Sequence, residues 1–534
     1  MIQACGVAHK SLVNPALLQV LFQYLKPSFL RTFLLLAVLT VLGVLVAGYH
    51  PGAEDDGIYL AAIQHNLHPG LFHADADFVM LQMRATIFDT LMAWAVQITN
   101  LPIAVVVLAC HLLTIFGILA ACYRIASRCF ENECARWCGV ALVTVFFTLP
   151  VAGTALYIVD QNLHPRAIAT ALALFALDYA LAERYVGAFV LAAVAFLFHP
   201  IMAAFGASLC FFLAMPGLPS LLRRPTTEGV ERELEPVAVL AALMVPIAAL
   251  TIPMRWIFEP GTPGWRAATN MRDFLVLSKW AWYEWLGAIG PVFILLWVAS
   301  IARRRAQPML GRVVTRLAAY GVFQLVVALM IALPPVLERL RPLQPMRYLH
   351  LLYVLLLLLG GCFVGENFLR HHRWRWVALF VPVALGMFLA QRALYPASPH
   401  LELPGIHSSN PWLTAFEWIR KNTPEDAYFA LGPDYMHRPG EDNHGFRSLA
   451  LRSALADNVK DSAVVTLVPG LGERWQREVA AQRANHEDWR QISTADLRTL
   501  KAQFGVNWVI LEEPAELGLE CPYRNTKLEV CRID

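Results

Sequence analysis

Charged residues are scarce in this sequence of 534 residues. Asp, Glu, Lys and Arg together make up 16% of it, whereas soluble domains carry about 25%. The apolar residues stand in long blocks, and the mean hydropathy is positive, +0.50. The formal net charge is only +3, which excludes bulk electrostatic binding to nucleic acid. The composition therefore predicts a polytopic membrane protein.

Two further patterns are missing. Residues 1–30 lack a compact apolar core followed by a small-residue cleavage site, so we expect no cleaved signal peptide. The apolar spacing there instead predicts an interfacial amphipathic helix in segment 1–28. The loop CYRIASRCFENECARWC lacks the tight CxxC-like pair of a structural zinc site. Its four cysteines are therefore expected to be reduced structural thiols.

Long apolar runs predict the membrane spans, because a span needs about 20 apolar residues and we count about eleven such segments. They are 29–49, 101–121, 137–157, 165–183, 186–199, 201–215, 236–254, 287–302, 314–333, 345–365 and 375–395. The pair 186–199 and 201–215 is also compatible with one long helix bent at Pro200.

The Arg and Lys residues of the short loops predict the orientation. An N-terminus in the cytoplasm places the Arg-rich loops, such as RRRAQPMLGRVVTR, on the inner face. An odd number of spans then exports the tail. We expect a transmembrane domain at 29–398, with a large first outer loop at 50–100, and an exported α/β domain at 399–534.

The tail is polar, and its apolar periodicity is mixed. The segments TAFEWIRKN, GERWQREVAAQRA and DLRTLKAQF read as helices, and AYFALG and VNWVILEE read as strands. Cys521 and Cys531 flank PYRNTKLEV. An oxidising compartment permits a disulfide between them, and two unpaired thiols are the alternative.

Under this topology, four separate polar clusters fall on the outer face. They are Glu54, Asp55 and Asp56 in PGAEDDGIY; Asp160, Gln161, His164 and Arg166 in VDQNLHPR; His199 in FLFHP; and Arg339, Arg341, Gln344 and Arg347 in ERLRPLQPMR. Ionisable groups at the ends of membrane helices usually have a function. Four clusters on one face predict a shared cavity.

The residue types of this cavity suit one kind of reaction. A carboxylate beside other charges or an apolar wall serves as a general base. Arg binds phosphate through bidentate hydrogen bonds. A base opposite Arg and His at the outer surface suits glycosyl transfer from a polyprenyl-phosphate-linked sugar to a hydroxyl acceptor. The partners would be that donor, a glycan, lipid or protein acceptor, and membrane lipids.

The chain resembles the GT-C superfamily of integral-membrane glycosyltransferases. The resemblance rests on EDDGIY after the first span, on RPLQPMRYLHLLYVLLLL, and on the tail fragment AFEWIRKNTPEDAYF. It implies an inverting enzyme of the bacterial cytoplasmic membrane, with Asp55 or Asp56 as the catalytic base. It also implies that Arg347, together with Arg166, binds the lipid phosphate. The tail contains no WWDYG-type stretch, which argues against an oligosaccharyltransferase.

Several points stay open at this stage. Three adjacent acids leave undecided which one is the base. The sequence requires no cofactor, although Asp75 and Asp77 (HADAD) could join the EDD carboxylates around a divalent cation such as Mg or Mn.

Each cluster also has a plain structural interpretation. The acids could cap a helix, Arg347 could anchor the chain to lipid headgroups, and His199 could be a satisfied interhelical histidine. The rival functions are a lipid-linked glycan polymerase or ligase, a transporter, and a non-catalytic scaffold of the same fold. A transporter would carry ionisable residues in mid-span and inverted repeats, neither of which stands out here.

Overall fold

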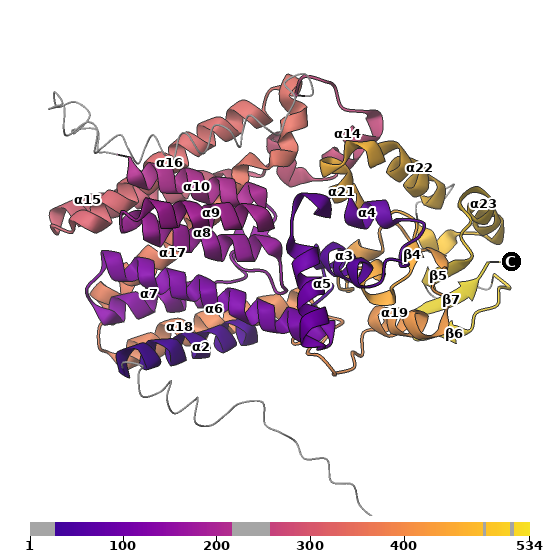
Figure 1. Cartoon of the computed structure of the whole chain (residues 1–534), viewed down its shortest axis with the longest axis horizontal. Coiled ribbons are helices and arrows are strands. Elements are labelled where there is room, and N and C mark those ends of the chain that lie inside the picture. Colours follow the sequence, from indigo (N-terminus) through magenta and orange to yellow (C-terminus); the bar gives the residue numbers. More distant parts are fainter. Residues whose placement is uncertain (1–26, 216–256, 484–487, 513–516, 534) are drawn as a thin grey trace, which may run out of the picture.

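The computed structural model describes residues 27–215, 257–483, 488–512 and 517–533. A bundle of apolar helices occupies one half of the molecule, and the tail after residue 399 occupies the other (Figure 1). Short helices of the first outer loop lie between the two. The predicted interfacial helix, apart from its last two residues, and the predicted span 236–254 lie outside the described residues.

Among the described residues, six helical stretches are long and apolar enough to cross a membrane. They are α2 (Pro27–Ala47), α6 (Ile103–Cys129), α15 (Trp282–Arg304), α16 (Pro308–Ala332), the stretch of η5 (Pro345–Tyr348), α17 (Leu349–Val364) and η6 (Gly365–Leu369), and α18 (Arg373–Leu394). Shorter helices of the bundle are α7 (Glu133–Val145), α8 (Pro165–Leu181), α9 (Tyr185–Phe198) and α10 (Pro200–Ala214). Each predicted span among the described residues overlaps one of these helices.

The structure corrects one predicted span and resolves the alternative that the sequence left open for another pair. The segment 137–157 is not one helix, because α7 ends at Val145 and a hairpin of β1 (Pro150–Val151) and β2 (Leu156–Tyr157) follows. Pro150 lacks a backbone N–H, and Gly153 has φ +62°, a backbone conformation that favours glycine. The helices α9 and α10 pack against each other and against α8, so they form a hairpin rather than one bent helix.

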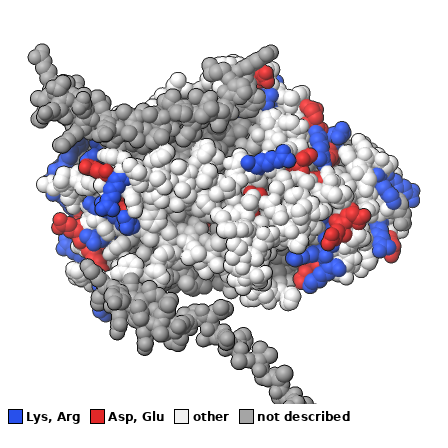
Figure 2. Space-filling view, in the orientation of Figure 1, with Lys and Arg blue, Asp and Glu red and all other residues white. Residues whose placement is uncertain are grey.

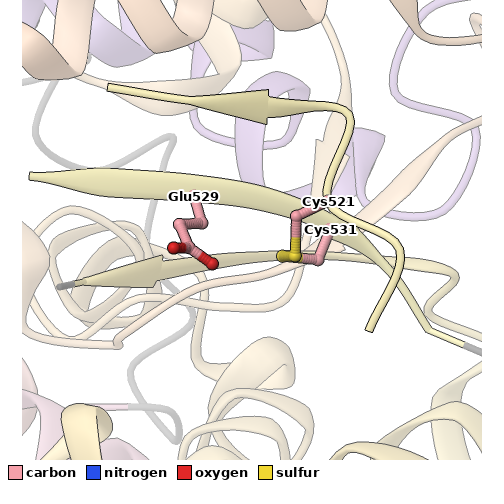
Figure 3. A group of neighbouring side chains, drawn as sticks. All are labelled: Cys521, Glu529 and Cys531. Carbon is pink, nitrogen blue, oxygen red and sulfur yellow. A yellow bond between two sulfur atoms is a disulfide. The ribbon is translucent and has the colours of Figure 1, made fainter. Parts of the chain in front are cut away.

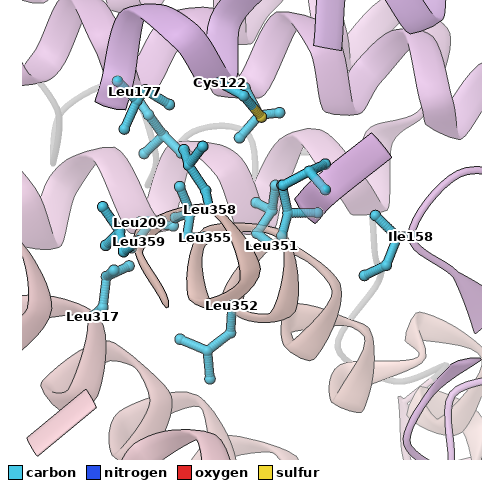
Figure 4. Packing of buried hydrophobic residues seen from close by; sticks show 14 of the residues in the cluster. Cys122, Ile158, Leu177, Leu209, Leu317, Leu351, Leu352, Leu355, Leu358 and Leu359 are labelled. Carbon is cyan, nitrogen blue, oxygen red and sulfur yellow. The ribbon is translucent and has the colours of Figure 1, made fainter. Parts of the chain in front are cut away.

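The core of the bundle surrounds α17. Figure 4 shows Leu351, Leu355 and Leu358 of α17 among the buried side chains contributed by neighbouring helices. The run LHLLYVLLLLL is apolar on all sides, which is the pattern of a helix enclosed by others. The helix α18 is peripheral instead, and it exposes Val381, Leu385 and other apolar residues.

Charged side chains gather at the two ends of the molecule on the face seen in Figure 2, and the helices between them are almost uncharged. An apolar belt of this kind matches the hydrocarbon layer of a bilayer. The tail therefore lies beyond one end of the apolar belt, and the Arg-rich turns between helices lie at the other.

The first outer loop folds into short helices. They are α3 (Asp56–Leu67), α4 (Ala76–Met80), η1 (Met83–Ala85) and α5 (Phe88–Thr99). The later outer segment contains α14 (Pro263–Asn270), η2 (Asp273–Leu275) and η3 (Leu277–Lys279), and η4 (Pro335–Leu343) precedes the η5–α17 stretch.

The tail is built on a five-stranded sheet of order β4-β3-β5-β7-β6, in which β3 pairs in parallel with β4 and β5. The strands are β3 (Tyr428–Ala430), β4 (Ser453–Ala454), β5 (Trp508–Glu512), β6 (Tyr523–Arg524) and β7 (Leu528–Arg532). The helices are α19 (Pro411–Asn422), η7 (Tyr435–His437), α20 (Phe446–Ala450), α21 (Asp461–Leu467), η8 (Pro469–Leu471), α22 (Gly472–Arg483), η9 (Trp489–Gln491) and α23 (Thr494–Phe504). All five tail elements predicted from the sequence are present.

Cys521 and Cys531 are joined by a disulfide, which ties β7 to the segment before β6 (Figure 3). Glu529 lies beside it on β7. Because both sulfur atoms are bonded to each other, this trio offers no thiolate to a metal ion.

The tail is fastened to the first outer loop by backbone contacts. Ala53 bridges to His444, and Gly445 N–H donates to the Gly52 carbonyl at 2.8 Å. The backbones of Gly57 and Gly445 also touch, since a Cβ on Gly445 would lie 2.8 Å from the Cα of Gly57. The acidic loop and the tail therefore form one packed unit.

We expect Gly445→Ala to destabilise this unit, because its methyl group would force two backbones apart. Overpacking of this kind costs about 1–3 kcal/mol, so the unfolding temperature in lipid nanodiscs should fall. The matched control is Gly470→Ala, because a Cβ at Gly470 meets nothing within 4 Å. Equal unfolding temperatures for the two variants would contradict the close approach.

Candidate functional site

A cavity of about 940 Å³ lies where the bundle, the first outer loop and the tail meet. All four predicted polar clusters contribute to its wall. The predicted residues on the wall are Glu54, Asp55, Asp160, Gln161, His164, Arg166, His199, Gln344 and Arg347. Asp56 and Arg341 are not among its lining residues.

Asp55 stands between two groups of cations. Its Oδ1 accepts from Lys460 Nζ at 3.1 Å, and its Oδ2 accepts from Arg166 Nη1 at 3.3 Å. Burial alone would raise the pKa of Asp55, but Lys460, His164 and Arg166 outweigh it and hold that pKa well below its usual range. Its side chain remains 31% exposed. Asp55 is therefore an ionised carboxylate that is open to the cavity.

The guanidinium of Arg166 forms ion pairs with two carboxylates, those of Asp55 and Asp160. Its guanidinium donates to both oxygens of Asp160, with Nε at 2.8 Å from Oδ2, in addition to its bond to Asp55. This bidentate pair is the strong form of the Arg–carboxylate interaction. Arg166 and Asp160 were predicted to bind substrate. In the structure they form an ion pair with each other.

His164 caps α8 and faces Asp55. Its Nδ1 accepts from the Arg166 backbone N–H at 3.1 Å, which places the proton of a neutral ring on Nε2. Nε2 lies 3.7 Å from Asp55 Oδ2. Burial, helped by Arg166, lowers the pKa of His164 to about 4. The ring is therefore neutral, and its Nε2 lies near Asp55 without a hydrogen bond to it.

Asp56 lies behind the cavity wall. It is 1% exposed, and its Oδ2 accepts from the Gly52 backbone N–H at 2.7 Å. Burial, reinforced by Asp160 and Asp55, raises the pKa of Asp56 to about 7. Its place fits a carboxyl group that shapes the turn before α3. Of the three acids that the sequence offered as the base, Glu54 and Asp55 line the cavity and Asp56 does not.

Glu54 is fully engaged in bonds to the tail. Its Oε2 accepts from Lys460 Nζ at 2.6 Å, and its Oε1 accepts from Asn443 Nδ2. Its φ of +54° is a left-handed conformation that costs a non-glycine residue about 1–3 kcal/mol. Sequence reasoning missed Lys460, because a single lysine in a polar tail carries no pattern.

Two guanidinium groups on the wall lack a carboxylate partner among the described residues. Arg347 is 8% exposed, its Nε makes no hydrogen bond, and its Cζ lies 5.5 Å from the centre of the Phe274 ring. Within the described residues, Arg272 donates to the Val459 carbonyl and to Ser462 Oγ. Arg272 follows α14 and was not predicted. Two guanidinium groups without a described carboxylate partner, Arg347 buried and Arg272 partly buried, make this part of the cavity attractive to an anion.

Some of the remaining predicted residues line the cavity, and others lie outside it. His199 lines the cavity, and its Nδ1 accepts from the Met202 N–H at 3.3 Å as the cap of α10. Gln344 lines it with φ +52° and a buried, unbonded Oε1. Arg341 lines a smaller neighbouring pocket with Gln344 and Arg347. Arg339 donates to the backbone carbonyls of Glu259 and Pro260.

The carboxylates of the wall are poorly arranged for a divalent cation. Asp55 and Asp160 already accept from Lys460 and Arg166. Asp75, proposed as a possible ligand, is ion-paired with Arg447 instead. Among the described residues, a group spaced for a cation is formed by Glu402, Asp442 and His444. Glu402 accepts there from His50 and His444, so these residues also join the first loop to the tail.

The cavity reaches the apolar exterior of the bundle. Tyr283, Glu284 and Gly287 of α15 line it, while Trp282 and Leu286 of the same helix are 76% and 62% exposed. Leu467 of the tail lines the cavity and is also exposed. A ligand with a polar head and a long apolar chain fits such a boundary.

Comparisons with known proteins give little beyond this geometry. No family model matches the chain, and no curated protein does. A solved structure of the archaeal oligosaccharyltransferase AglB from Archaeoglobus fulgidus, in complex with an inhibitory peptide and a dolichol-phosphate, aligns at 11% identity with a TM-score of 0.43. It covers 90% of this chain and 69% of that one.

A second structure, the Archaeoglobus fulgidus oligosaccharyltransferase with Zn and sulfate, aligns at 11% identity with a TM-score of 0.44. It covers 89% of this chain and 67% of that one. Similarity at this level carries no argument about function.

The raised pKa of Asp56 predicts a pH effect on stability. A carboxyl group with a folded-state pKa of about 7 binds more protons folded than unfolded, so its contribution to stability is lost as the pH rises from about 4 to 7. Asp56→Asn keeps an oxygen for the Gly52 N–H. We expect the unfolding temperature of the native protein to fall relative to Asp56→Asn over this range. A constant difference would contradict the assignment.

Proposed function

We propose that this chain is an integral-membrane glycosyltransferase of the GT-C type. It moves a sugar from a polyprenyl-phosphate donor to a hydroxyl acceptor on the outer side of a bacterial cytoplasmic membrane. One observation carries the proposal: the ionised carboxylate of Asp55 lines one cavity with the guanidinium of Arg347, which has no carboxylate partner in the described part of the chain, and this cavity borders apolar surface.

Asp55 is the catalytic base. The acceptor O–H gives its proton to Asp55 while the acceptor oxygen bonds to the anomeric carbon. The bond from that carbon to the phosphate oxygen breaks, and the lipid phosphate leaves with the electron pair. Direct displacement of this kind inverts the anomeric carbon. Because the low pKa makes Asp55 a weak base, the proton transfers only as the attacking oxygen becomes acidic.

Arg347 binds the departing phosphate. As the bond to the sugar breaks, negative charge grows on the leaving phosphate. A fixed cation in a water-poor site stabilises this developing charge more than it stabilises the phosphate of the intact donor. Arg272, in the segment after α14, supports Arg347, because it also lines the cavity and no carboxylate in the described ranges pairs with it. Arg166 has a different part, since its bonds to Asp55 and Asp160 hold the base in place.

The lipid chain lies outside the cavity, along the exposed apolar face of α15. Trp282 and Leu286 offer that surface beside the lining residues Tyr283 and Gly287. The acceptor approaches from the side of the tail. The excess of Arg in the loops at the opposite end supports a cytoplasmic N-terminus and an exported tail.

Asp55→Asn should reduce transfer by about 10²–10⁴-fold, because it removes the proton acceptor and keeps the shape. Asp56→Asn should stay within about threefold of the native rate, since Asp56 does not line the cavity. The assay is transfer from a pool of polyprenyl-phosphate sugars by protein in nanodiscs. Full activity of Asp55→Asn, or equal loss in both variants, would overturn the assignment of the base.

Arg347→Gln should lower turnover by about 10²–10³-fold, because the leaving phosphate loses its cation. It should also weaken binding of polyprenyl phosphate itself, measured by displacement of a labelled lipid. Arg312→Gln is the matched control, since Arg312 lies at the opposite end near Glu183. Unchanged lipid-phosphate binding by Arg347→Gln would remove this residue from the site.

A further inference from the structure

Lys460 brings a charge from the tail into the cavity. It is 5% exposed, and its Nζ donates to Glu54 Oε2 at 2.6 Å and to Asp55 Oδ1 at 3.1 Å. The other described tail residues on the wall are Ala463, Thr466 and Leu467. Within the described residues of the tail, Lys460 is therefore the charged group at this wall.

The backbone around Lys460 is held by a buried network. Its N–H donates to Asp457 Oδ1 at 2.6 Å, and the Asp457 N–H donates to Asp461 Oδ2 at 2.8 Å. Arg447 donates to both oxygens of Asp461, each at 2.9 Å. A lysine normally loses much rotamer freedom when it is fixed. Here the fixed backbone and the two carboxylates direct the ammonium group to one place.

Lys460 and Arg166 divide the oxygens of Asp55 between them. Lys460 takes Oδ1 from the tail, and Arg166 takes Oδ2 from α8. Two opposed hydrogen bonds fix the plane of the carboxylate. Each carboxylate oxygen still has a second lone pair for an incoming proton. The contact between the tail and the loop thus supplies one of the two hydrogen bonds that orient Asp55.

We propose that Lys460 is a positioning residue for the transfer reaction, and that the docked tail completes the catalytic site by holding Asp55 through it. This inference rests on the proposed function. It goes further, because it makes the exported domain part of the machinery rather than a separate module.

The electrostatic surroundings of Asp55 are mixed, so the effect of Lys460 must be separated from the others. The charged or titratable groups that face Asp55 or act on it are Glu54, Asp56, Tyr59, Asp160, His164, Arg166, Arg272, Arg347 and Lys460. Of these, Lys460 exerts the largest opposing influence on the carboxyl group after burial.

The first test compares Lys460→Met with Lys460→Arg in full-length protein. Lys460→Met should lower kcat about tenfold or more, with the KM for the lipid donor nearly unchanged. The acid limb of the pH–rate profile should move to higher pH, because Asp55 loses a stabilising cation. Lys460→Arg should restore most of the rate and the native profile. The control is Lys501→Met, since Lys501 bonds the Ile533 carbonyl in the tail.

A native kcat and profile in Lys460→Met, while Asp55→Asn is inactive, would overturn the role of Lys460 and leave the proposed function standing. A purely structural role would lower the amount of folded protein without moving the acid limb. That result would also overturn the proposal.

A second measurement does not depend on enzymatic turnover, so its result is informative even if the proposed function is wrong. The unfolding temperatures of Lys460→Met, Asp55→Asn and the double variant form a double-mutant cycle. If Lys460 holds Asp55, the double variant should be less destabilised than the sum of the single ones. Additive losses would overturn the contact.

Discussion

The ion pairs of Asp55 with Lys460 and Arg166 join three parts of the chain that are far apart in sequence. Asp55 belongs to the first outer loop, Arg166 to α8 and Lys460 to the tail. Burying these charges is costly, and each is tolerated because its partners are present. Removing one partner would leave another uncompensated. The rest of the cavity follows from this arrangement, because it fixes where the loop and the tail meet.

The backbone at this meeting point is under strain. Glu54 has a left-handed φ, and Gly57 and Gly445 approach so closely that a side chain on either would be crowded. Such strain persists only where surrounding contacts over-determine it. The bonds from Asn443 and Lys460 to Glu54 supply those contacts. The acids after the first span therefore connect the first outer loop to the tail, rather than forming a solvated helix cap.

Much of the architecture was predictable, because apolar runs and charge patterns are local. The helices of the bundle, the tail elements and the meeting of four polar clusters at one cavity all follow from short stretches of sequence. The hairpin after α7 was missed, since an apolar run that holds Pro150 and Gly153 still looks like a span by hydropathy. The choice between Asp55 and Asp56 was also hidden, because neighbouring residues point in different directions only once α3 is in place.

Residues that are placed in the cavity by long-range contacts gave no signal in the sequence. Lys460 and Arg272 stand alone in polar segments, and Arg166 looked like a phosphate ligand until Asp160 was seen to occupy it. Pairing across hundreds of positions is a property of the packed chain, not of any motif. That Arg347 has no carboxylate partner within the described residues is likewise visible only in the folded chain.

The central claim is that Asp55 and Arg347 serve one lipid-linked substrate in one cavity. The most direct test is an electron cryo-microscopy structure of the protein in nanodiscs with an added polyprenyl phosphate. The account predicts phosphate density against Arg347, with Asp55 across the cavity and the lipid chain along α15. Density for the phosphate elsewhere, with the cavity filled by water alone, would contradict it.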